Sequence, residues 1–281
     1  MIDRRSLLLA GLSGATLWAP ASAQQRRSLT DPMRLGVDHA LADSGLAKSL
    51  QRAFGRDTGI AVQLVPGAAL PLLEALERGE VDAALTNAPD AEVKLEKLGL
   101  AHDRRAVAGA GYVIVGPAAK GKLRDPAGIA GGRDVAEALQ RIRDAAAAVP
   151  GTVLFLTSGD GSGTHAAELA LWRAAKVAPV APWYATADRQ SSLIAQVRAR
   201  SAYAIVERGN WAALGGAPLA LLVDGDPLLS GAVHVMRSFR VNHPAAKIFV
   251  AWIAGPKGMR VAAAQRGYRA PGADTVAPLR R

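Results

Sequence analysis

The apolar positions of the chain follow two periodicities that alternate along its length. Short runs of apolar and β-branched residues, such as Ile60 to Val65, predict buried strands. Between them, apolar residues recur at helical spacing, as in Leu46 to Phe54. Further strands are expected at Asp82 to Thr86, Tyr112 to Val115, Val153 to Thr157, Tyr203 to Val206, Leu219 to Val223 and Val233 to Met236, and further helices at Leu70 to Arg78, Val135 to Ala148, Thr164 to Ala175, Ser191 to Arg200 and Ala245 to Ala254. The alternation predicts an α/β chain in which helices cover the faces of two parallel sheets.

Two segments rich in glycine and proline divide this pattern. Gly116-Pro117 follows a strand, and the cluster from Gly209 to Pro218 separates two strands. We interpret them as two crossovers between two α/β lobes. Lobe 1 is then expected to comprise residues 31–115 and 211–268, lobe 2 to be an insertion of residues 116–210, and residues 269–281 to form a loosely ordered tail.

The N-terminus predicts export. Arg4-Arg5 precede an apolar run from Leu7 to Trp18, and Ala21 to Ala23 supply the small residues at which a signal peptidase cuts. We therefore expect residues 1–23 to be a signal peptide that is removed near Ala23, leaving a periplasmic protein. The paired arginines are compatible with both the general and the twin-arginine export routes.

The amino-acid composition excludes several kinds of site and binding partner. Half of the residues are hydrophobic and 21% are charged, which is typical of a globular protein. The chain has no cysteine, which excludes disulfides, cysteine-bound zinc, thiol catalysis and an N-terminal lipid anchor. The net charge of +10 comes from scattered basic residues with only 5% aromatics, so nucleic-acid binding is not expected. The five histidines include no pair with metal-ligand spacing, so we expect neither a metal site nor a cofactor.

The most informative stretch runs from Thr157 to His165, between a strand and an amphipathic helix. Glycines let the backbone approach a ligand, and the start of a helix offers free N–H groups and partial positive charge to an anion. The alternative is an ordinary N-cap after a glycine-rich turn. The predicted ligand-binding residues here are Ser158, Gly159, Asp160, Ser162, Gly163 and Thr164.

A second stretch, Asp38 to Gly45, opens another helix and could face the first across a cleft. We take Asp38, His39 and Ser44 as ligand-binding candidates, although Ser44 could equally cap the following helix. Arg189 precedes a later helix and is a candidate source of positive charge, with a solvated surface arginine as the alternative.

Two motif matches do not predict catalysis. Gly116 to Lys122 has the glycine and lysine spacing of a phosphate-binding loop, but Leu123 stands where Mg²⁺ needs a hydroxyl. Ser162 has Asp160 and Thr164 where a hydrolase elbow requires glycines. We expect no catalytic residues and no enzymatic activity.

The same stretches make the sequence resemble the tungstate-binding (TupA-like) receptors of ABC importers, within the periplasmic binding protein superfamily. The matching segments, in order, are Asp43 to Leu46, Ala88 to Glu92, Arg104-Arg105, Val113 to Pro117, Gly159 to His165, Glu168 to Trp172, Ala202-Tyr203 and Gly225 to Pro227. The resemblance implies a class II-like fold, with two α/β lobes joined by two crossovers, that closes around a small ligand or oxyanion. It also implies a partner, an ABC permease in the inner membrane, and we expect the receptor itself to be a monomer.

The resemblance further implies how an oxyanion would be held: by a threonine-rich stretch, by an arginine two residues before the aspartate of the second motif, and by that motif's threonine. Only the threonine carries over, onto Thr164, because Ser158 replaces the arginine and Val37 to Leu41 replace the threonine-rich stretch. We therefore expect an importer receptor with altered ligand specificity. One alternative is a receptor for another oxyanion, an organic acid or a cation-containing species that engages Asp38, His39 and Asp160. The other is a periplasmic sensor or accessory subunit with the same fold.

Overall fold

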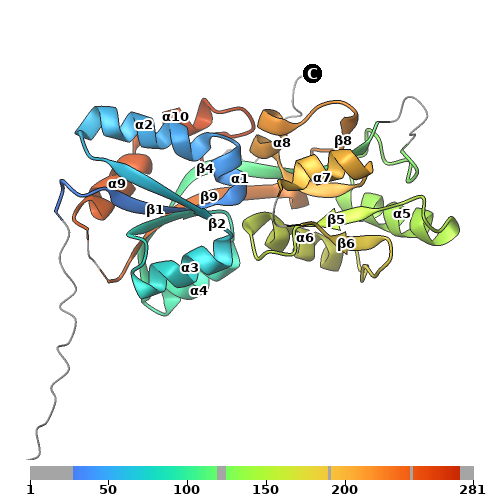
Figure 1. The fold of residues 1–281 in the computed structure, drawn as a ribbon, viewed down its shortest axis with the longest axis horizontal. Helices are drawn as coiled ribbons and strands as arrows, with labels where there is room; N and C mark the ends of the chain where they lie inside the picture. Colours follow the sequence, from blue (N-terminus) through green and yellow to red (C-terminus); the bar gives the residue numbers. More distant parts are fainter. Residues whose placement is uncertain (1–27, 119–124, 189–190, 241–242, 273–281) are drawn as a thin grey trace, which may run out of the picture.

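The computed structural model describes residues 28–118, 125–188, 191–240 and 243–272. Two α/β lobes lie side by side along the long axis of the molecule (Figure 1). The predicted signal peptide and Arg189 lie outside the described residues. Within the described ranges, no helix has both the length and the apolar character needed to cross a bilayer.

The sheet of lobe 1 is mixed rather than parallel. β1 (Met33–Asp38) pairs in parallel with β2 (Val62–Gly67) and with β3 (Ala83–Thr86). β9 (Ser230–Ser238) then lies antiparallel to β3 and to β4 (Ala101–Pro117). The expectation of parallel sheets was wrong. After the segments of lobe 2, the chain returns to lobe 1 as β9, which lies between β3 and β4 and runs antiparallel to both.

One long strand joins the lobes. Residues 101–111 of β4 pair with β9, whereas residues 112–117 pair with β7 (Ala204–Glu207) and β8 (Leu219–Val223). β5 (Phe155–Thr157) and β6 (Tyr184–Thr186) form a small parallel pair in lobe 2. The chain therefore passes into lobe 2 without leaving the strand conformation.

The strand pairing bears on the lobe boundaries, which stay a prediction. The partners of β4 change between Gly111 and Tyr112, before the predicted boundary at Gly116. β8 pairs with the same part of β4 as β7 does, on its other edge, which favours a return to lobe 1 after β8 rather than at residue 211. Arg269, at the start of the expected loose tail, exchanges two backbone hydrogen bonds with Gly109; residues 273–281 lie outside the described part of the chain.

Helices cover both sheets as the pattern predicts (Figure 1). Lobe 1 carries α1 (His39–Asp43), α2 (Leu46–Thr58), α3 (Ala69–Arg78), α4 (Pro89–Lys97), α9 (Ala245–Ile253) and α10 (Pro256–Ala263), and lobe 2 carries α5 (Val135–Ala148), α6 (Gly163–Ala174) and α7 (Leu193–Arg200), with α8 (Arg208–Leu214) and the 3₁₀ turn η1 (Pro227–Leu229) near the junction. The sequence pattern missed α1, α4, α8, α10 and β6. Most of these are short, and glycines in and after α8 made that segment resemble a loop.

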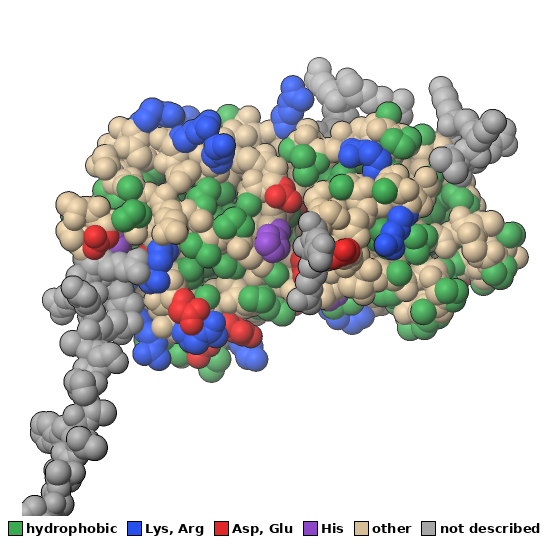
Figure 2. All heavy atoms as spheres, in the orientation of Figure 1, with side chains coloured by type: hydrophobic (Ala, Val, Ile, Leu, Met, Phe, Trp, Pro, Cys, Tyr) green, Lys and Arg blue, Asp and Glu red, His purple; other side chains and the backbone are tan. Residues whose placement is uncertain are grey.

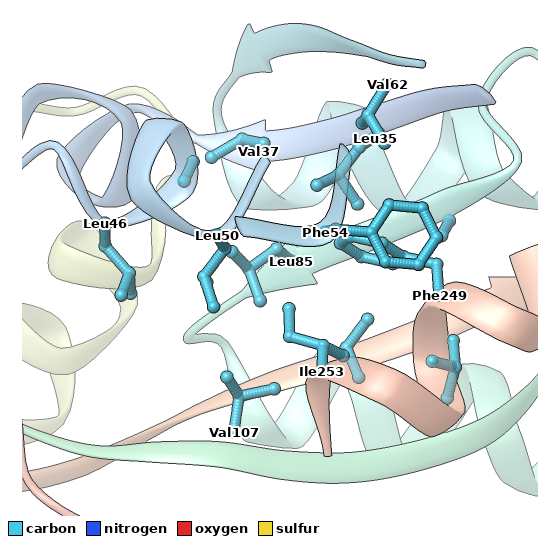
Figure 3. Packing of buried hydrophobic residues seen from close by; sticks show 14 of the residues in the cluster. Leu35, Val37, Leu46, Leu50, Phe54, Val62, Leu85, Val107, Phe249 and Ile253 are labelled. Carbon is cyan, nitrogen blue, oxygen red and sulfur yellow. The ribbon is translucent and has the colours of Figure 1, made fainter. Parts of the chain in front are cut away.

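Each lobe has its own apolar core, as the sequence pattern requires. In lobe 1, Phe54 of α2 packs edge-on against Phe249 of α9, with ring centroids 5.0 Å apart. Figure 3 shows these rings beside Leu35, Leu50 and other aliphatic side chains from the sheet and helices. In lobe 2, Trp172 and Phe155 form a comparable edge-on pair at 5.0 Å. Separate cores let each lobe hold its half of a shared cleft.

Candidate functional site

A cleft of about 520 Å³ lies between the lobes. Its walls come from the carboxyl end of β1 with α1, the start of α3, the glycine-rich loop before α6, the segment before α7, and the junction of β7 with α8. The lining residues are Asp38, His39, Ala40, Asp43, Ala68, Pro71, Ser158, Asp160, Ser162, Thr164, Ala187, Asp188, Ser191, Ser192, Leu193, Val206, Glu207 and Asn210. Figure 2 shows acidic side chains and a histidine gathered where the two lobes meet.

Asp38 ends β1 and joins the two lobes. Its Oδ1 accepts a hydrogen bond from Ala40 N (3.0 Å), which caps α1, and its Oδ2 accepts one from Gly163 N (3.0 Å), at the start of α6 in the other lobe. The side chain is fully buried. Burial raises the pKa of Asp38 to about 6, because the two amide hydrogen bonds offset only part of the lost hydration of the carboxylate.

The glycine-rich loop is held by its own side chains. Asp160 Oδ1 accepts hydrogen bonds from Ser158 Oγ (2.9 Å) and from Ser162 N (2.9 Å). Ser162 in turn caps α6 by accepting from His165 N (3.2 Å). Burial raises the pKa of Asp160, but the hydrogen bonds from Ser162 and Ser158 outweigh it and leave this pKa below its ordinary value. The loop therefore presents an ionised carboxylate to the cleft.

The lobes touch directly at one edge of the cleft. Leu70 N in lobe 1 donates to Gly161 O in lobe 2 (3.0 Å). Gly163 packs so closely on Asn87 that a Cβ there would overlap the Asn87 side chain. The structure is thus a closed arrangement in which α6 starts against the carboxyl ends of β1 and β3.

Two polar atoms that line the cleft have no partner. Thr164 Oγ1 and Glu207 Oε1 are buried without a hydrogen bond, and their residues are only 6% and 1% exposed. Tyr268 donates to the other carboxyl oxygen of Glu207 (2.9 Å). Burial raises the pKa of Glu207 to about 8. Buried polar groups without partners are rare, and in a cleft they indicate atoms that a ligand satisfies.

The structure brings most of the predicted site residues together. Six of them line the cleft: Asp38, His39, Ser158, Asp160, Ser162 and Thr164. Their role in binding a ligand stays a prediction. Gly159 and Gly163 contribute backbone next to it and are absent from its lining, although Gly163 donates to Asp38. Ser44 is also absent from the lining, because its hydroxyl donates to Leu41 O (3.1 Å) and lies 2.7 Å from the Tyr268 hydroxyl, behind the cleft wall.

Glu207 and Asn210 are among the lining residues that sequence reasoning missed. Glu207 directly follows the predicted strand Tyr203 to Val206, and ligands of α/β folds bind beyond the carboxyl ends of strands. That rule could have identified Glu207. Asn210 lies within α8, which the pattern treated as a loop, so its position had no signal. Across the described ranges, no three histidine, aspartate or glutamate side chains are arranged to hold a metal ion.

Residues 39–257 match the family model described as the PBP superfamily domain. The chain belongs to the PBP superfamily. This match confirms the resemblance proposed from the Asp-Ser-Gly and Ser-Gly-Thr stretches, and the two-lobed fold agrees with it.

Proteins named for tungstate binding or transport resemble the chain over most of its length. The tungstate-binding protein TupA of Peptoclostridium acidaminophilum is 27% identical, over 89% of this chain and 87% of its own. The crystal structure of the tungstate ABC transporter from Geobacter sulfurreducens aligns with a TM-score of 0.71 and 30% identity, over 82% of this chain and 97% of its own. The tungstate-binding protein TupA of Desulfovibrio alaskensis aligns with a TM-score of 0.65 and 27% identity, over 85% and 98%.

Proposed function

We propose that the chain is the exported solute-binding receptor of an ABC importer, with a specificity changed from the oxyanions of its relatives. Membership of the PBP superfamily, two lobes with separate cores and a polar cleft between them support the receptor role. In this proposal the protein acts as a periplasmic monomer, is cleaved near Ala23, and presents its closed form to an inner-membrane permease.

The main support for a changed specificity is the hydrogen bond that Gly163 N donates to Asp38 Oδ2. The first amides of a helix are the donors that an oxyanion uses. Here the chain's own carboxylate accepts from such an amide. A bound dianion would also meet Asp38 as a like charge, and at about 4 Å such repulsion costs about 4 kcal/mol per pair of unit charges at an effective dielectric of about 20.

Ser158 supports the same conclusion. It stands where the resemblance implies an oxyanion-binding arginine, and its hydroxyl donates to Asp160 (2.9 Å). The position thus carries no positive charge, and its neighbour is a carboxylate. Arg189, which lies outside the described residues, remains the predicted alternative source of positive charge.

Titration calorimetry with tungstate and molybdate tests this proposal. We expect the unmodified protein to bind neither tighter than about micromolar. The double variant Asp38→Ala with Ser158→Arg frees the Gly163 amide and restores an arginine, so its tungstate affinity is expected to rise at least 10- to 150-fold, the value of one charge-assisted hydrogen bond of about 1.5–3 kcal/mol.

Controls separate the added charge from the loss of the Ser158 hydroxyl, and from any charge that Arg189 supplies. Ser158→Ala removes the hydroxyl without adding charge and is expected to leave tungstate binding weak. Nanomolar tungstate binding by the unmodified protein would contradict the change of specificity, and its loss in Arg189→Ala would show that the positive charge had moved to that residue.

A further inference from the structure

The charges around the cleft have one predominant sign. Its lining includes five carboxyl groups, whereas its described residues include no lysine or arginine and a single histidine, His39. The acidic residues are Asp38, Asp43, Asp160, Asp188 and Glu207. Arg208 is directly adjacent in sequence, but its guanidinium is bound to Asp224 in a buried ion pair. A solute that enters the cleft therefore meets negative charge from both lobes.

Glu207 supplies the acceptor within this cleft. Its Oε1 has no hydrogen-bond partner although the residue is only 1% exposed. Its other oxygen accepts a hydrogen bond from the hydroxyl of the buried Tyr268 (2.9 Å). Thr164, 6% exposed and also without a partner at Oγ1, adds a hydroxyl from the start of α6 in the same lobe. The two atoms are independent of the exposed acidic residues at the rim.

The volume of the cleft and the side chains that line it indicate which kind of ion it can hold. The volume of about 520 Å³ matches pockets for organic molecules and exceeds what a bare metal ion or a tetrahedral anion fills. Among the residues described, the acidic and histidine side chains form no group of three that could coordinate a metal. An alkylammonium group instead needs one or two acceptors at hydrogen-bond distance and tolerates hydroxyl and amide neighbours.

We infer that the cleft binds a small organic ammonium ion, with the Glu207 carboxylate accepting from its N–H group and Thr164 and Asn210 contacting the rest of the solute. Asp160 adds a second negative charge from the glycine-rich loop. This inference rests on the proposed receptor function, and it names the class of solute that the receptor carries.

Four-carbon probes of equal length test the charge preference. Binding of putrescine, n-butylammonium, 1,4-butanediol and succinate is measured by calorimetry and thermal shift at about pH 9, above the raised pKa of Glu207, with tungstate in parallel. We expect both ammonium probes to bind with a Kd below about 10 mM, and at least tenfold tighter than the diol or succinate. Glu207→Gln keeps the shape of the side chain and removes its charge, so the ammonium affinity is expected to fall about 10- to 150-fold.

Matched variants separate a binding role from a structural one. Glu168→Gln alters another buried carboxyl that lies outside the cleft lining, and it is expected to leave ammonium binding unchanged. Asp160→Asn, in the glycine-rich loop of the same lobe, is expected to weaken binding of the ammonium ions while leaving binding of the diol unchanged.

The outcomes distinguish this inference from the proposed function. Binding of the diol or succinate as tightly as the ammonium ions, or no ammonium binding below about 10 mM, would overturn the inference and leave a receptor for another solute. An unchanged affinity in Glu207→Gln would also overturn it. Nanomolar tungstate binding would refute the change of specificity itself.

Discussion

The free energy of unfolding is expected to fall as the pH rises from about 5 to about 8. Three buried carboxyl groups cause this dependence. Burial raises the pKa of Asp38 from 3.8 to about 6, that of Glu168 from 4.5 to about 7, and that of Glu207 from 4.5 to about 8. In each case the dominant cause is the loss of hydration of the charged form.

The sign follows from proton binding. Between its ordinary pKa and its raised pKa, each group holds a proton in the folded protein but not in the unfolded chain. The resulting stabilisation is complete below the ordinary pKa and is lost as the pH rises through the raised one. Carboxyl groups with a lowered pKa, such as Glu92 and Asp160, act in the opposite direction, but their effect is lost only as the pH falls below about 4.5, outside this window.

The magnitude can be worked for Asp38. A shift of about 2 pKa units at about 1.4 kcal/mol per unit gives about 3 kcal/mol over the full titration. The raised pKa of Asp38 already includes the opposing effect of the hydrogen bonds from Ala40 and Gly163, which lower it. About half of this loss of stability is expected between pH 5 and 7. Because the pKa of Glu207 is raised further, this group extends the loss of stability to about pH 8.

Urea unfolding of the wild type and three amide variants, measured from pH 5 to 9, tests these assignments. Asp38→Asn is expected to flatten the dependence below about pH 6, and Glu207→Gln the dependence up to about pH 8. Glu168→Gln serves as the control outside the cleft, with its effect near pH 7. A wild-type stability that is constant or rises between pH 5 and 8 would refute the reasoning, as would slopes that none of the variants changes.

Three further results are expected. Gly163→Ala places a Cβ in the Asn87 side chain, so small-angle scattering should show a more open protein than Gly55→Ala, a helical control with space for the methyl group. Arg104→Ala leaves the buried Glu92 carboxylate short of a cation and should lower the free energy of unfolding by about 3 kcal/mol in urea titrations; an unchanged midpoint would contradict this. Intact mass of periplasmic protein should place the N-terminus near Gln24, whereas an uncut chain in the cytosol would refute export.

The sequence by itself was sufficient for the fold class. The spacing of apolar residues along the chain predicts strands and helices. The cores of both lobes consist of these apolar positions, such as Leu50 and Phe54 on one face of α2. Part of the cleft could also be predicted, because the stretches that open α1 and α6 carry polar residues and glycines directly after strands. These are local signals, and neighbouring residues suffice to produce them.

Only the tertiary structure decided what the cleft presents to a ligand. The bond from Gly163 N to Asp38 joins residues 125 positions apart, and it exists because the closed lobes bring the start of α6 to the end of β1. The burial of Glu207 likewise depends on Tyr268, 61 positions later in the chain. Burial and proximity across such separations determine pKa values and the sign of the charge in the cleft, and no local pattern in the sequence encodes them.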